Sequence, residues 1–350
     1  MKGVVFPGDR KVAYIDVPVP TPGPLDVIVE MKASGMCGTD LQNYRRASDQ
    51  PPYMPPLIDR PPIAGHEPAG VISEVGALVS RAQARVGQRV MVHHYQGCNS
   101  CELCRSGWQQ LCQDVKPMVH VYGNNDDGGH AQFLKVPANT IVDLPDELSF
   151  ETGAAISCGT GTAYSALRRL NLSARDTIAV FGQGPVGLSA TQLAHAMNAR
   201  VIALDINSER LNRAREFGAD VLVNPAQSDT VSLLREETRG RGVDFALETS
   251  GSGAARASAV RSTRIWGTCC FVGEGGDVTI NVSPDMLRRQ MTIIGHWTFS
   301  HMGQAECARF VAERGIKVDR IFTHRWSLSQ AAEAYDLFDR GIGGKGVFLI

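Results

Sequence analysis

The fold of this chain is decided by the stretch Thr177-Ile178-Ala179-Val180-Phe181-Gly182-Gln183-Gly184-Pro185-Val186-Gly187. Its first five residues form an apolar run, which is typical of a strand buried on both faces of a parallel sheet. The next six residues match the pattern G-x-G-x-x-G, and Pro185 suits the first turn of a helix, where a missing N–H costs least. The glycine pattern alone is weak, but between a strand and a helix it indicates a turn that binds a dinucleotide.

Each glycine of this pattern has its own physical role. Gly182 allows the tight turn, Gly184 lets the backbone approach a pyrophosphate, and Gly187 lets the helix pack closely on the strand. The N-terminus of a helix offers free N–H groups to an anion. We therefore include Pro185 and Val186, the first residues of the predicted helix, in the predicted cofactor site.

Asp205 ends the next predicted strand, 18 residues after Gly187. A carboxylate at this position accepts hydrogen bonds from the adenosine ribose and repels the 2′-phosphate of NADP, so NAD is favoured. Arg210 lies nearby and either flanks the adenine or supports a phosphate. The alternatives are a glycine turn in an ordinary α/β domain and a plain exposed strand end at Asp205.

Strands and helices alternate after residue 150, which predicts a doubly wound α/β domain with a parallel sheet. The first 150 residues instead indicate short strands, glycine turns and loops, and the six prolines within 51–62 exclude regular structure there. A helix over 329–339 and a strand over 346–349 are predicted near the C-terminus. Because one hydrophobic core rarely grows beyond about 250–300 residues, the 350-residue chain is expected to form two domains.

The composition is that of a globular protein, with 43% hydrophobic and 20% charged residues. A formal net charge of −1 argues against a dedicated nucleic-acid binder. Apolar stretches of about 18 residues are absent, so no transmembrane helix is expected. The N-terminal residues lack the features of a signal peptide, and we therefore expect a cytoplasmic protein.

Four of the nine cysteines follow the spacing Cys98-x2-Cys101-x2-Cys104-x7-Cys112. Four thiolates at about 2.3 Å from Zn²⁺ form a closed tetrahedral site that stabilises a fold and leaves no open coordination position. Free or disulfide-bonded cysteines are the plain alternative. A zinc-ribbon module for nucleic acid is another, but the local sequence is not strongly basic.

Cys37, His66 and Cys158 are also metal-ligand types, although each is a weak signal alone. A lone cysteine is usually a small hydrophobic residue, and a lone histidine is usually a satisfied polar group. Whether these three residues bind a metal must therefore be judged from the motifs in which they occur.

Together these features make the chain resemble the zinc-containing medium-chain alcohol dehydrogenase family over essentially all 350 residues. The four-cysteine segment and the glycine pattern carry the resemblance in the family's order. Four short motifs add to it: Cys37-Gly38-Thr39-Asp40, Gly65-His66-Glu67, Asp127-Gly128-Gly129-His130-Ala131 and Gly344-Lys345-Gly346-Val347.

The resemblance implies a GroES-like β-rich catalytic domain over 1–153 and 296–350, with a zinc lobe at about 95–115. A Rossmann domain over 154–295 lies between these segments in the chain. It also implies a homodimer or homotetramer that acts on a small-molecule alcohol.

A catalytic Zn²⁺ held by Cys37, His66 and Cys158 follows from the same resemblance, with the fourth position open. In the family, Glu67 lies beside the metal and can replace the substrate or water as a ligand. In polyol and threonine dehydrogenases the third ligand is instead a glutamate, which keeps Glu151 as an alternative to Cys158.

Further roles are implied residue by residue. Asp40 orients His66 through its second ring nitrogen, and Thr39 takes the proton of the alcohol. Lys345 matches a basic position that contacts the cofactor pyrophosphate in some relatives, with a solvated surface lysine as the alternative.

The proton relay departs from the family pattern. Many members carry a histidine where this chain has Gln42, and glutamine cannot act as a base. Either the ribose hydroxyl passes the proton directly to water, or His93 or His94 substitutes. Family topology also suggests an aromatic substrate pocket from His94, Tyr95, Trp108, Tyr122 and Trp297.

We therefore expect an enzyme, an NAD-dependent dehydrogenase of an alcohol or polyol with two Zn²⁺ per chain. Activity like that of L-threonine 3-dehydrogenase or sorbitol dehydrogenase is the near alternative. An enone or quinone reductase would lack the catalytic zinc ligands. A non-catalytic zinc- and nucleotide-binding protein is the alternative of another class.

Overall fold

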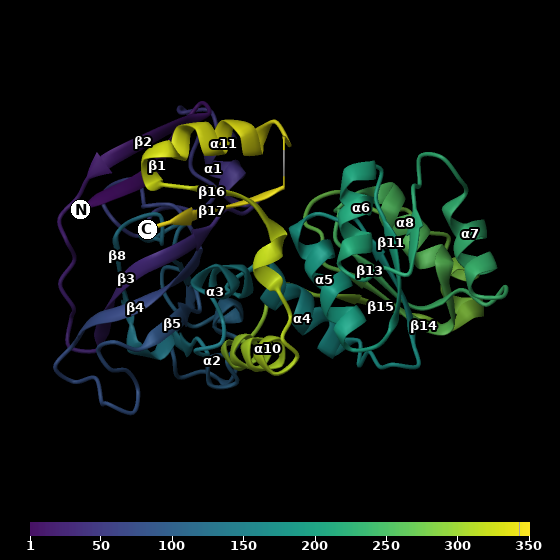
Figure 1. Cartoon of the computed structure of the whole chain (residues 1–350), viewed down its shortest axis with the longest axis horizontal. Coiled ribbons are helices and arrows are strands. Elements are labelled where there is room, and N and C mark those ends of the chain that lie inside the picture. Colours follow the sequence, from purple (N-terminus) through teal and green to yellow (C-terminus); the bar gives the residue numbers. More distant parts are fainter. Residues whose placement is uncertain (343) are drawn as a thin grey trace. The chain divides into compact units, whose positions relative to one another are not determined.

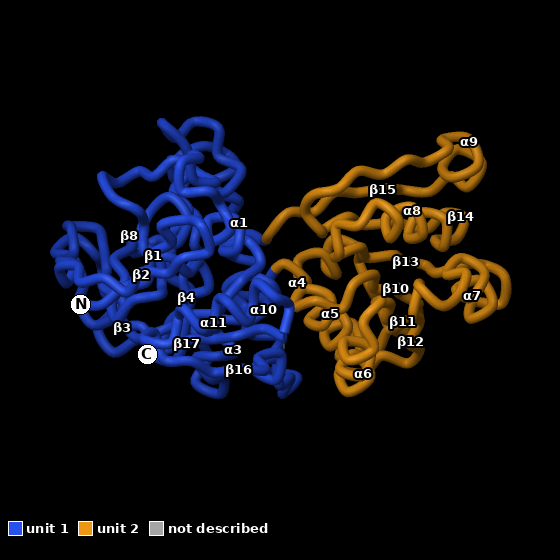
Figure 2. The backbone as a smooth tube through the Cα atoms, turned by 90° about the horizontal axis from the view of Figure 1, so that it is seen from above, with its two compact units in different colours: residues 1–161, 299–350 blue, residues 162–298 orange. Residues whose placement is uncertain are grey.

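The computed structural model describes residues 1–342 and 344–350. The backbone forms two compact units, residues 1–161 with 299–350 and residues 162–298 (Figure 2). The chain therefore passes between the units twice, and both termini belong to the first unit (Figure 1). The boundaries expected from the sequence were 153 and 296.

The second unit is built on a parallel sheet with the strand order β12-β11-β10-β13-β14-β15. Its strands are β10 (Thr177–Phe181), β11 (Arg200–Leu204), β12 (Val221–Val223), β13 (Val243–Glu248), β14 (Thr263–Phe271) and β15 (Thr292–Gly295). Ile178, Ala179 and Val180 of β10 are fully buried, as the apolar run predicts. The parallel α/β sheet predicted from the sequence is confirmed.

Helix α4 (Gly159–Arg169) precedes the first of these strands, and the strands are connected by α5 (Pro185–Ala196), α6 (Ser208–Glu216), α7 (Thr230–Glu237), α8 (Gly253–Ser262) and α9 (Val282–Asp285). The strand order runs outward from β10 in one direction and from β13 in the other. Right-handed crossovers therefore place α5 and α8 on opposite faces of the sheet. The reversal of strand order between β10 and β13 is the switch point where ligands bind in such sheets.

The first unit is rich in strands. Its main sheet has the order β16-β17-β3-β4-β5-β9, and β8 also pairs with β3. These strands are β3 (Asp26–Gly35), β4 (Glu67–Val75), β5 (Arg89–Val92), β8 (Phe133–Pro137), β9 (Ile141–Asp143), β16 (Phe322–Trp326) and β17 (Lys345–Leu349). Val27, Val29, Ile72 and Val90 are buried at its core.

Smaller elements complete this unit. They are the hairpin β1 (Lys2–Gly8) and β2 (Lys11–Asp16), the pair β6 (Tyr95–Gln96) and β7 (His120–Val121), and the helices α1 (Asp40–Arg45), α2 (Glu102–Arg105), α3 (Phe150–Ile156), α10 (His301–Glu313) and α11 (Ala331–Asp339). A second core joins the two ends of the chain, with Phe6, Tyr44, Tyr335 and Phe348 packed together. Figure 1 shows α11, coloured yellow, beside the purple N-terminal hairpin.

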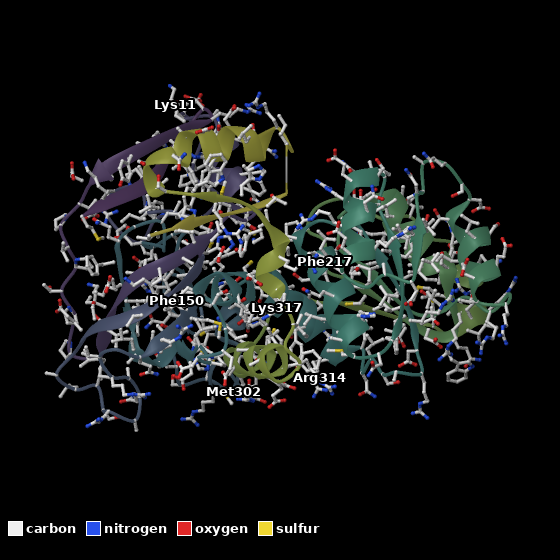
Figure 3. The ribbon with its side chains drawn as sticks, in the orientation of Figure 1. Lys11, Phe150, Phe217, Met302, Arg314 and Lys317 are labelled. Atoms are coloured by element: carbon white, nitrogen blue, oxygen red, sulfur yellow. The ribbon has the colours of Figure 1, made fainter. Side chains whose placement is uncertain are left out.

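The sequence reading missed several elements, including α7, α8 and α10. The sequence of α8, Gly253-Ala-Ala-Arg-Ala-Ser-Ala-Val-Arg-Ser262, has little apolar periodicity, so no pattern marked it as a helix. Helix α10 is half covered, and its Met302 is exposed on the outer side (Figure 3). Among the described residues, no helix is both long enough and apolar enough to cross a membrane.

Candidate functional site

Two groups of metal-ligand side chains converge in the first unit. The first consists of Cys98, Cys101, Cys104 and Cys112. The Sγ atoms of Cys98 and Cys104 lie 3.9 Å apart, as do those of Cys101 and Cys112. Four thiolates about 2.3 Å from a tetrahedral Zn²⁺ would lie about 3.8 Å from one another, so the four side chains fit that ion.

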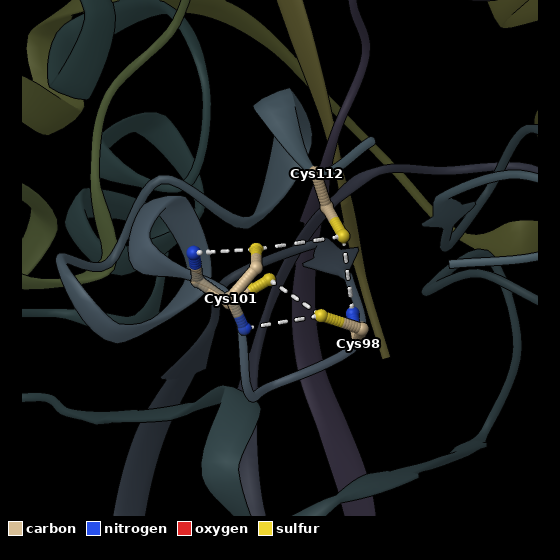
Figure 4. A group of neighbouring side chains, drawn as sticks. Cys98, Cys101 and Cys112 are labelled. Carbon is tan, nitrogen blue, oxygen red and sulfur yellow. Dashed lines mark hydrogen bonds between the residues drawn. The ribbon is translucent and has the colours of Figure 1, made fainter. Parts of the chain in front are cut away.

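Backbone N–H groups point at these sulfur atoms. The N–H groups of Cys98, Cys101 and Cys104 donate to the sulfurs of Cys112, Cys98 and Cys101, at 3.3 to 3.4 Å (Figure 4). The side chain and N–H of Ser100 also donate to Cys98, and these bonds lower the pKa of that thiol to about 6. Donors of this kind stabilise thiolates, the form that binds metal.

The second group is Cys37, His66, Glu67 and Cys158, whose ligand atoms lie within 4.8 Å of one another. Cys37 follows β3, His66 directly precedes β4, Glu67 begins β4, and Cys158 lies between α3 and α4. The two Sγ atoms are 3.9 Å apart, the same spacing as in the four-cysteine group. Thr39 Oγ1 lies 3.9 Å from the Cys37 sulfur. The structure therefore gathers into one cluster residues that are far apart in the sequence.

Asp40 fixes the orientation of His66. Its Oδ1 lies 3.0 Å from Nδ1 of His66, which leaves Nε2 of the ring for a metal. Its Oδ2 accepts the N–H of Cys37 at 2.8 Å and the hydroxyl of Tyr335 at 3.1 Å. Asp40 and His66 are 2% and 3% exposed, so this arrangement is shielded from water.

Glu67 is fully buried and reaches across the sheet. Gly35 lies opposite it on β3, where a Cβ atom would overlap the Glu67 carboxylate, so only glycine lets the side chain pass. Glu67 Oε1 lies 2.6 Å from the ammonium group of Lys345. Burial raises the pKa of Glu67 to about 7, and the Lys345 charge opposes that rise. Among the described residues, no hydrogen-bond partner contacts Oε2 of Glu67.

The structure rules out the surface-lysine alternative for Lys345. The side chain is 2% exposed and also donates to the carbonyl of Met36 at 2.7 Å. Lys345 is therefore not a surface lysine. The reason is topological, because β17 pairs with β3 and brings Lys345 beside the residues that lead to Cys37.

Glu151, the alternative third ligand, lies outside both clusters. Its carboxylate pairs with Arg325 at 2.6 Å. The turn that carries Cys158 is instead linked to β4, since the Ser157 hydroxyl lies 3.1 Å from the carbonyl of Pro68. The cysteine, and not Glu151, thus completes the cluster.

The two histidines considered for the proton relay are both buried. The ring centroid of His94 lies 5.2 Å from that of His66, and its Nδ1 lies 3.0 Å from the carbonyl of Ser157. Burial lowers the pKa of His94 well below its usual value and that of His93 to about 3. Gln42 is exposed on α1.

Only some of the residues expected to line an aromatic substrate pocket lie close together in the first unit. His94 and Tyr95 are in contact, with ring centroids 4.1 Å apart. Tyr122 instead packs in the core of the main sheet, and its hydroxyl donates to Gln96 at 2.7 Å. Trp297 belongs to the other unit and is 45% exposed.

The glycine turn lies at the switch point of the parallel sheet. Gly182 has a φ of +88°, which glycine adopts without strain. A Cβ at Gly187 would overlap the carbonyl of Gly182, so the close helix–strand packing requires glycine there. A Cβ at Gly184 would meet no atom of the chain within 4 Å. The backbone is therefore open at Gly184, where a pyrophosphate would approach the N-terminus of α5 at Pro185 and Val186.

Asp205 lies beside this turn, at the end of β11. Its Oδ2 accepts the N–H of Gln183 at 2.7 Å, and its Oδ1 accepts the N–H of Asn207 at 2.9 Å. The guanidinium of Arg210 is 3.9 Å from Asp205. Each carboxylate oxygen keeps lone pairs for further donors, so the group suits ribose hydroxyls.

Sequence reasoning missed two residues of the metal-ligand surroundings. Tyr335 contacts Asp40, and His130 contacts Tyr335 at 2.7 Å. His130 lies in one of the short motifs, but the motif did not indicate what its ring contacts. No sequence signal marks Tyr335, because its partners are about 200 and 300 residues away.

Comparison with known proteins agrees with this geometry. The model of the alcohol dehydrogenase GroES-like domain matches residues 23–146, and that of the zinc-binding dehydrogenases matches residues 185–313. The uncharacterized zinc-type alcohol dehydrogenase-like protein YphC of Escherichia coli K12 is 37% identical, over 99% of this chain and 98% of its own. Sorbitol dehydrogenase of Bacillus subtilis strain 168 is 32% identical, over 96% and 93%.

A solved structure extends the likeness to the whole backbone. Alcohol dehydrogenase TADH from Thermus sp. ATN1 superposes with a TM-score of 0.90 at 29% identity, covering 100% of this chain and 99% of its own.

Proposed function

The chain belongs to the zinc-dependent medium-chain alcohol dehydrogenase family, and from this premise we propose that it oxidises a primary or secondary alcohol or a polyol to the aldehyde or ketone. The reaction is reversible hydride transfer, with NAD as the acceptor. The observation that carries the proposal is the buried cluster of Cys37, His66 and Cys158, with Glu67 beside it. Two thiolates and one imidazole are the ligand set of a catalytic zinc in alcohol dehydrogenases.

Cys37, His66 and Cys158 would hold this zinc, and the orphan oxygen of Glu67 makes it an alternating ligand. When bound there, Zn²⁺ supplies a Lewis acid that polarises the substrate oxygen and lowers the pKa of its hydroxyl. The four cysteines of the other cluster would hold a second, structural Zn²⁺ in a closed site.

The chain's own side chains supply proton handling and orientation. Thr39 is half-buried beside Cys37, and its hydroxyl accepts the proton of the alcohol. Asp40 holds His66 in the tautomer that leaves Nε2 for the metal. Gln42 is exposed and cannot act as a base, so the proton leaves by a ribose hydroxyl to water or through His94.

The glycine turn at Gly182, Gly184 and Gly187, with Pro185 and Val186 at the N-terminus of α5, would bind the pyrophosphate of NAD. Asp205 would accept the adenosine ribose hydroxyls and repel a 2′-phosphate. Arg210 would lie along the adenine, with its charge directed toward Asp205.

We also propose that the chain forms a homodimer or homotetramer through its second unit. Strand β15 is an edge of the parallel sheet, and an unpaired edge is a template for pairing with another chain. Ile265 and Trp266 on β14, 57% and 70% exposed, add apolar surface near it. Light scattering after size-exclusion chromatography tests this assembly.

The substrate is tested with a panel of alcohols, diols, sugar alcohols and threonine, offered with NAD or NADP and followed by nicotinamide absorbance. Sugar alcohols come first, because a sorbitol dehydrogenase is among the relatives. Activity confined to threonine or sorbitol would select those alternatives within the family. About two zinc ions per chain are expected. A protein that binds zinc and nucleotide but is active on no substrate would instead be the non-catalytic alternative.

A further inference from the structure

A continuous line of hydrogen bonds leads from the interior of the first unit to the metal-ligand cluster. The hydroxyl of Ser34 lies 2.7 Å from Nδ1 of His130, and Nε2 of His130 lies 2.7 Å from the hydroxyl of Tyr335. Tyr335 is 3.1 Å from Asp40, and Asp40 is 3.0 Å from His66. All five side chains are at most 3% exposed.

The chemistry of these groups fixes the direction of each bond. A phenol has a single proton, and Asp40 as a carboxylate only accepts, so Tyr335 donates to Asp40. The Tyr335 oxygen then accepts from Nε2–H of His130. Burial lowers the pKa of His130 to about 4, so the ring is neutral and its Nδ1 accepts the proton of Ser34.

Asp40 therefore receives three donors, each from a different part of the chain. They are Nδ1 of His66, the backbone N–H of Cys37 and the hydroxyl of Tyr335. Two of them belong to predicted metal ligands. The third comes from α11, almost 300 residues later, and is the one that the C-terminal segment contributes.

The ring of His130 is itself held in one place. A Cβ at Gly65, the residue before His66, would overlap that ring, and Gly65 has a φ of +94°. The ring of Phe348 also packs edge-on against the His130 ring, with centroids 4.6 Å apart. A ring fixed in this way gives the Tyr335 hydroxyl a donor in a constant position.

We propose that His130 and Tyr335 are positioning residues of the metal centre, which hold the Asp40 carboxylate so that it fixes the ring of His66 toward the cluster. The inference rests on the proposed function, because it requires a metal on Cys37, His66 and Cys158. Within the described part of the chain, the side-chain hydrogen bonds of His130 and Tyr335 go to Ser34, to each other and to Asp40, so both act on the ligands through Asp40.

The test uses Tyr335→Phe, which removes one hydroxyl and keeps the ring. Tyr44→Phe is the matched control, because Tyr44 is 3% exposed in the same aromatic group, 5.8 Å from Tyr335, and its hydroxyl makes no hydrogen bond to the Asp40 carboxylate among the described residues. Zinc-loaded proteins are equilibrated with increasing chelator. Thiols that lose zinc are then alkylated and identified by peptide mass analysis. Cys37 and Cys158 report the catalytic centre, and Cys98 and Cys112 report the structural one.

We expect Tyr335→Phe to weaken zinc retention at Cys37 and Cys158 by about tenfold, the lower end of the effect seen for groups behind metal ligands. Retention at Cys98 and Cys112 should not change, and Tyr44→Phe should change neither. An unaltered chelator midpoint at Cys37 in Tyr335→Phe would overturn the inference, as would an equal loss in Tyr44→Phe.

A double variant separates positioning from stability. Tyr335→Phe alone leaves Nε2–H of His130 buried without an acceptor, which destabilises the fold. Adding His130→Leu removes that donor, so thermal stability should partly recover while zinc retention at Cys37 stays low. Zinc retention that recovers together with the melting temperature would indicate a merely structural role. If Cys37 and Cys158 of the unaltered protein react without chelator, the proposed function itself fails.

Discussion

Lys345 and Glu67 form a fully buried ion pair, 2.6 Å from Nζ to Oε1, that joins the last strand of the chain to the start of β4. The Lys345 ammonium is also held by the Met36 carbonyl, one residue before Cys37. The C-terminal segment therefore supports the metal-ligand cluster at two points, here and through Tyr335 on Asp40. The C-terminal segment therefore makes polar contacts that support the metal-ligand cluster, in addition to its apolar packing.

Removing one partner of this pair should be costly. Lys345→Met leaves the Glu67 charge buried and uncompensated, and such changes cost about 3–5 kcal/mol of unfolding free energy. The double variant Lys345→Met with Glu67→Gln should lose less, because no isolated charge remains. Chemical denaturation of the zinc-loaded proteins measures both. Equal losses in the single and double variants would contradict the argument.

The four-cysteine site should account for one of two zinc ions. Cys101→Ser is expected to lower the zinc content from about two ions per chain to about one, because the closed site needs all four thiolates. Thermal stability should fall with it, since structural zinc contributes folding free energy. Elemental analysis measures the number of zinc ions per chain. Cys307→Ala, a buried cysteine outside both clusters, is the control and should keep the full zinc content.

Asp205 should set the preference for NAD. Asp205→Ser removes the carboxylate proposed to accept the ribose hydroxyls, and a hydrogen bond to a charged group contributes about 1.5–3 kcal/mol, or about tenfold or more in kcat/KM. We expect kcat/KM for NAD to fall and that for NADP to rise. Asp220→Asn is the control, because Asp220 accepts a backbone N–H at the opposite end of β11. A wild-type enzyme that used only NADP would refute the assignment.

Stability should decrease as the solution becomes acidic. Burial lowers the pKa of His93 to about 3 and that of His130 to about 4, so both stay neutral in the folded protein while the unfolded chain takes up protons below about pH 6.5. The unfolded state binds more protons between those values, and stability is therefore lost as pH falls. At pH 5 each histidine should cost about 2 kcal/mol. Denaturation of His93→Gln should show a shallower pH dependence, and parallel curves would disprove the assignment.

Gln42 stands where many family members carry the histidine of the proton relay, so we expect this position to lack a base. Gln42→His introduces a titratable ring at this exposed position of α1, so the pH–rate profile should change more than the substrate KM. Steady-state kinetics from pH 6 to 10 with the best alcohol of the panel measure both. A profile identical to that of the unaltered enzyme would show that protons leave by another route.

Local sequence patterns were sufficient for the features whose parts are close in the chain. The β10 strand, the Gly182 turn and α5 occupy consecutive residues, and their bounds were predicted almost residue by residue. The short spacing within the four-cysteine segment likewise places Cys98, Cys101, Cys104 and Cys112 on one loop, which can wrap around a single metal ion. In both cases the geometry follows from short-range backbone conformation, which the residue types themselves dictate.

The sequence patterns were insufficient for elements without apolar periodicity and for contacts across the chain. Cys37, His66 and Cys158 had meaning only through family resemblance, because nothing local indicates that they meet. The burial of Lys345 against Glu67 was not predicted, and Tyr335 was not noticed. Antiparallel pairing of β3 with both β4 and β17 brings Cys37, His66 and Lys345 together, whereas Cys158 and Tyr335 arrive from helical segments.

The sequence by itself thus determined the parallel α/β fold, the glycine turn between β10 and α5, and the four-cysteine cluster. Only the tertiary structure decided how the second cluster is held, with Lys345 on Glu67 and with Ser34, His130 and Tyr335 behind Asp40. The physical reason is that a buried polar group must find a partner wherever the folded chain provides one. For Asp40 and Glu67 that partner comes from the last 16 residues of the 350-residue chain.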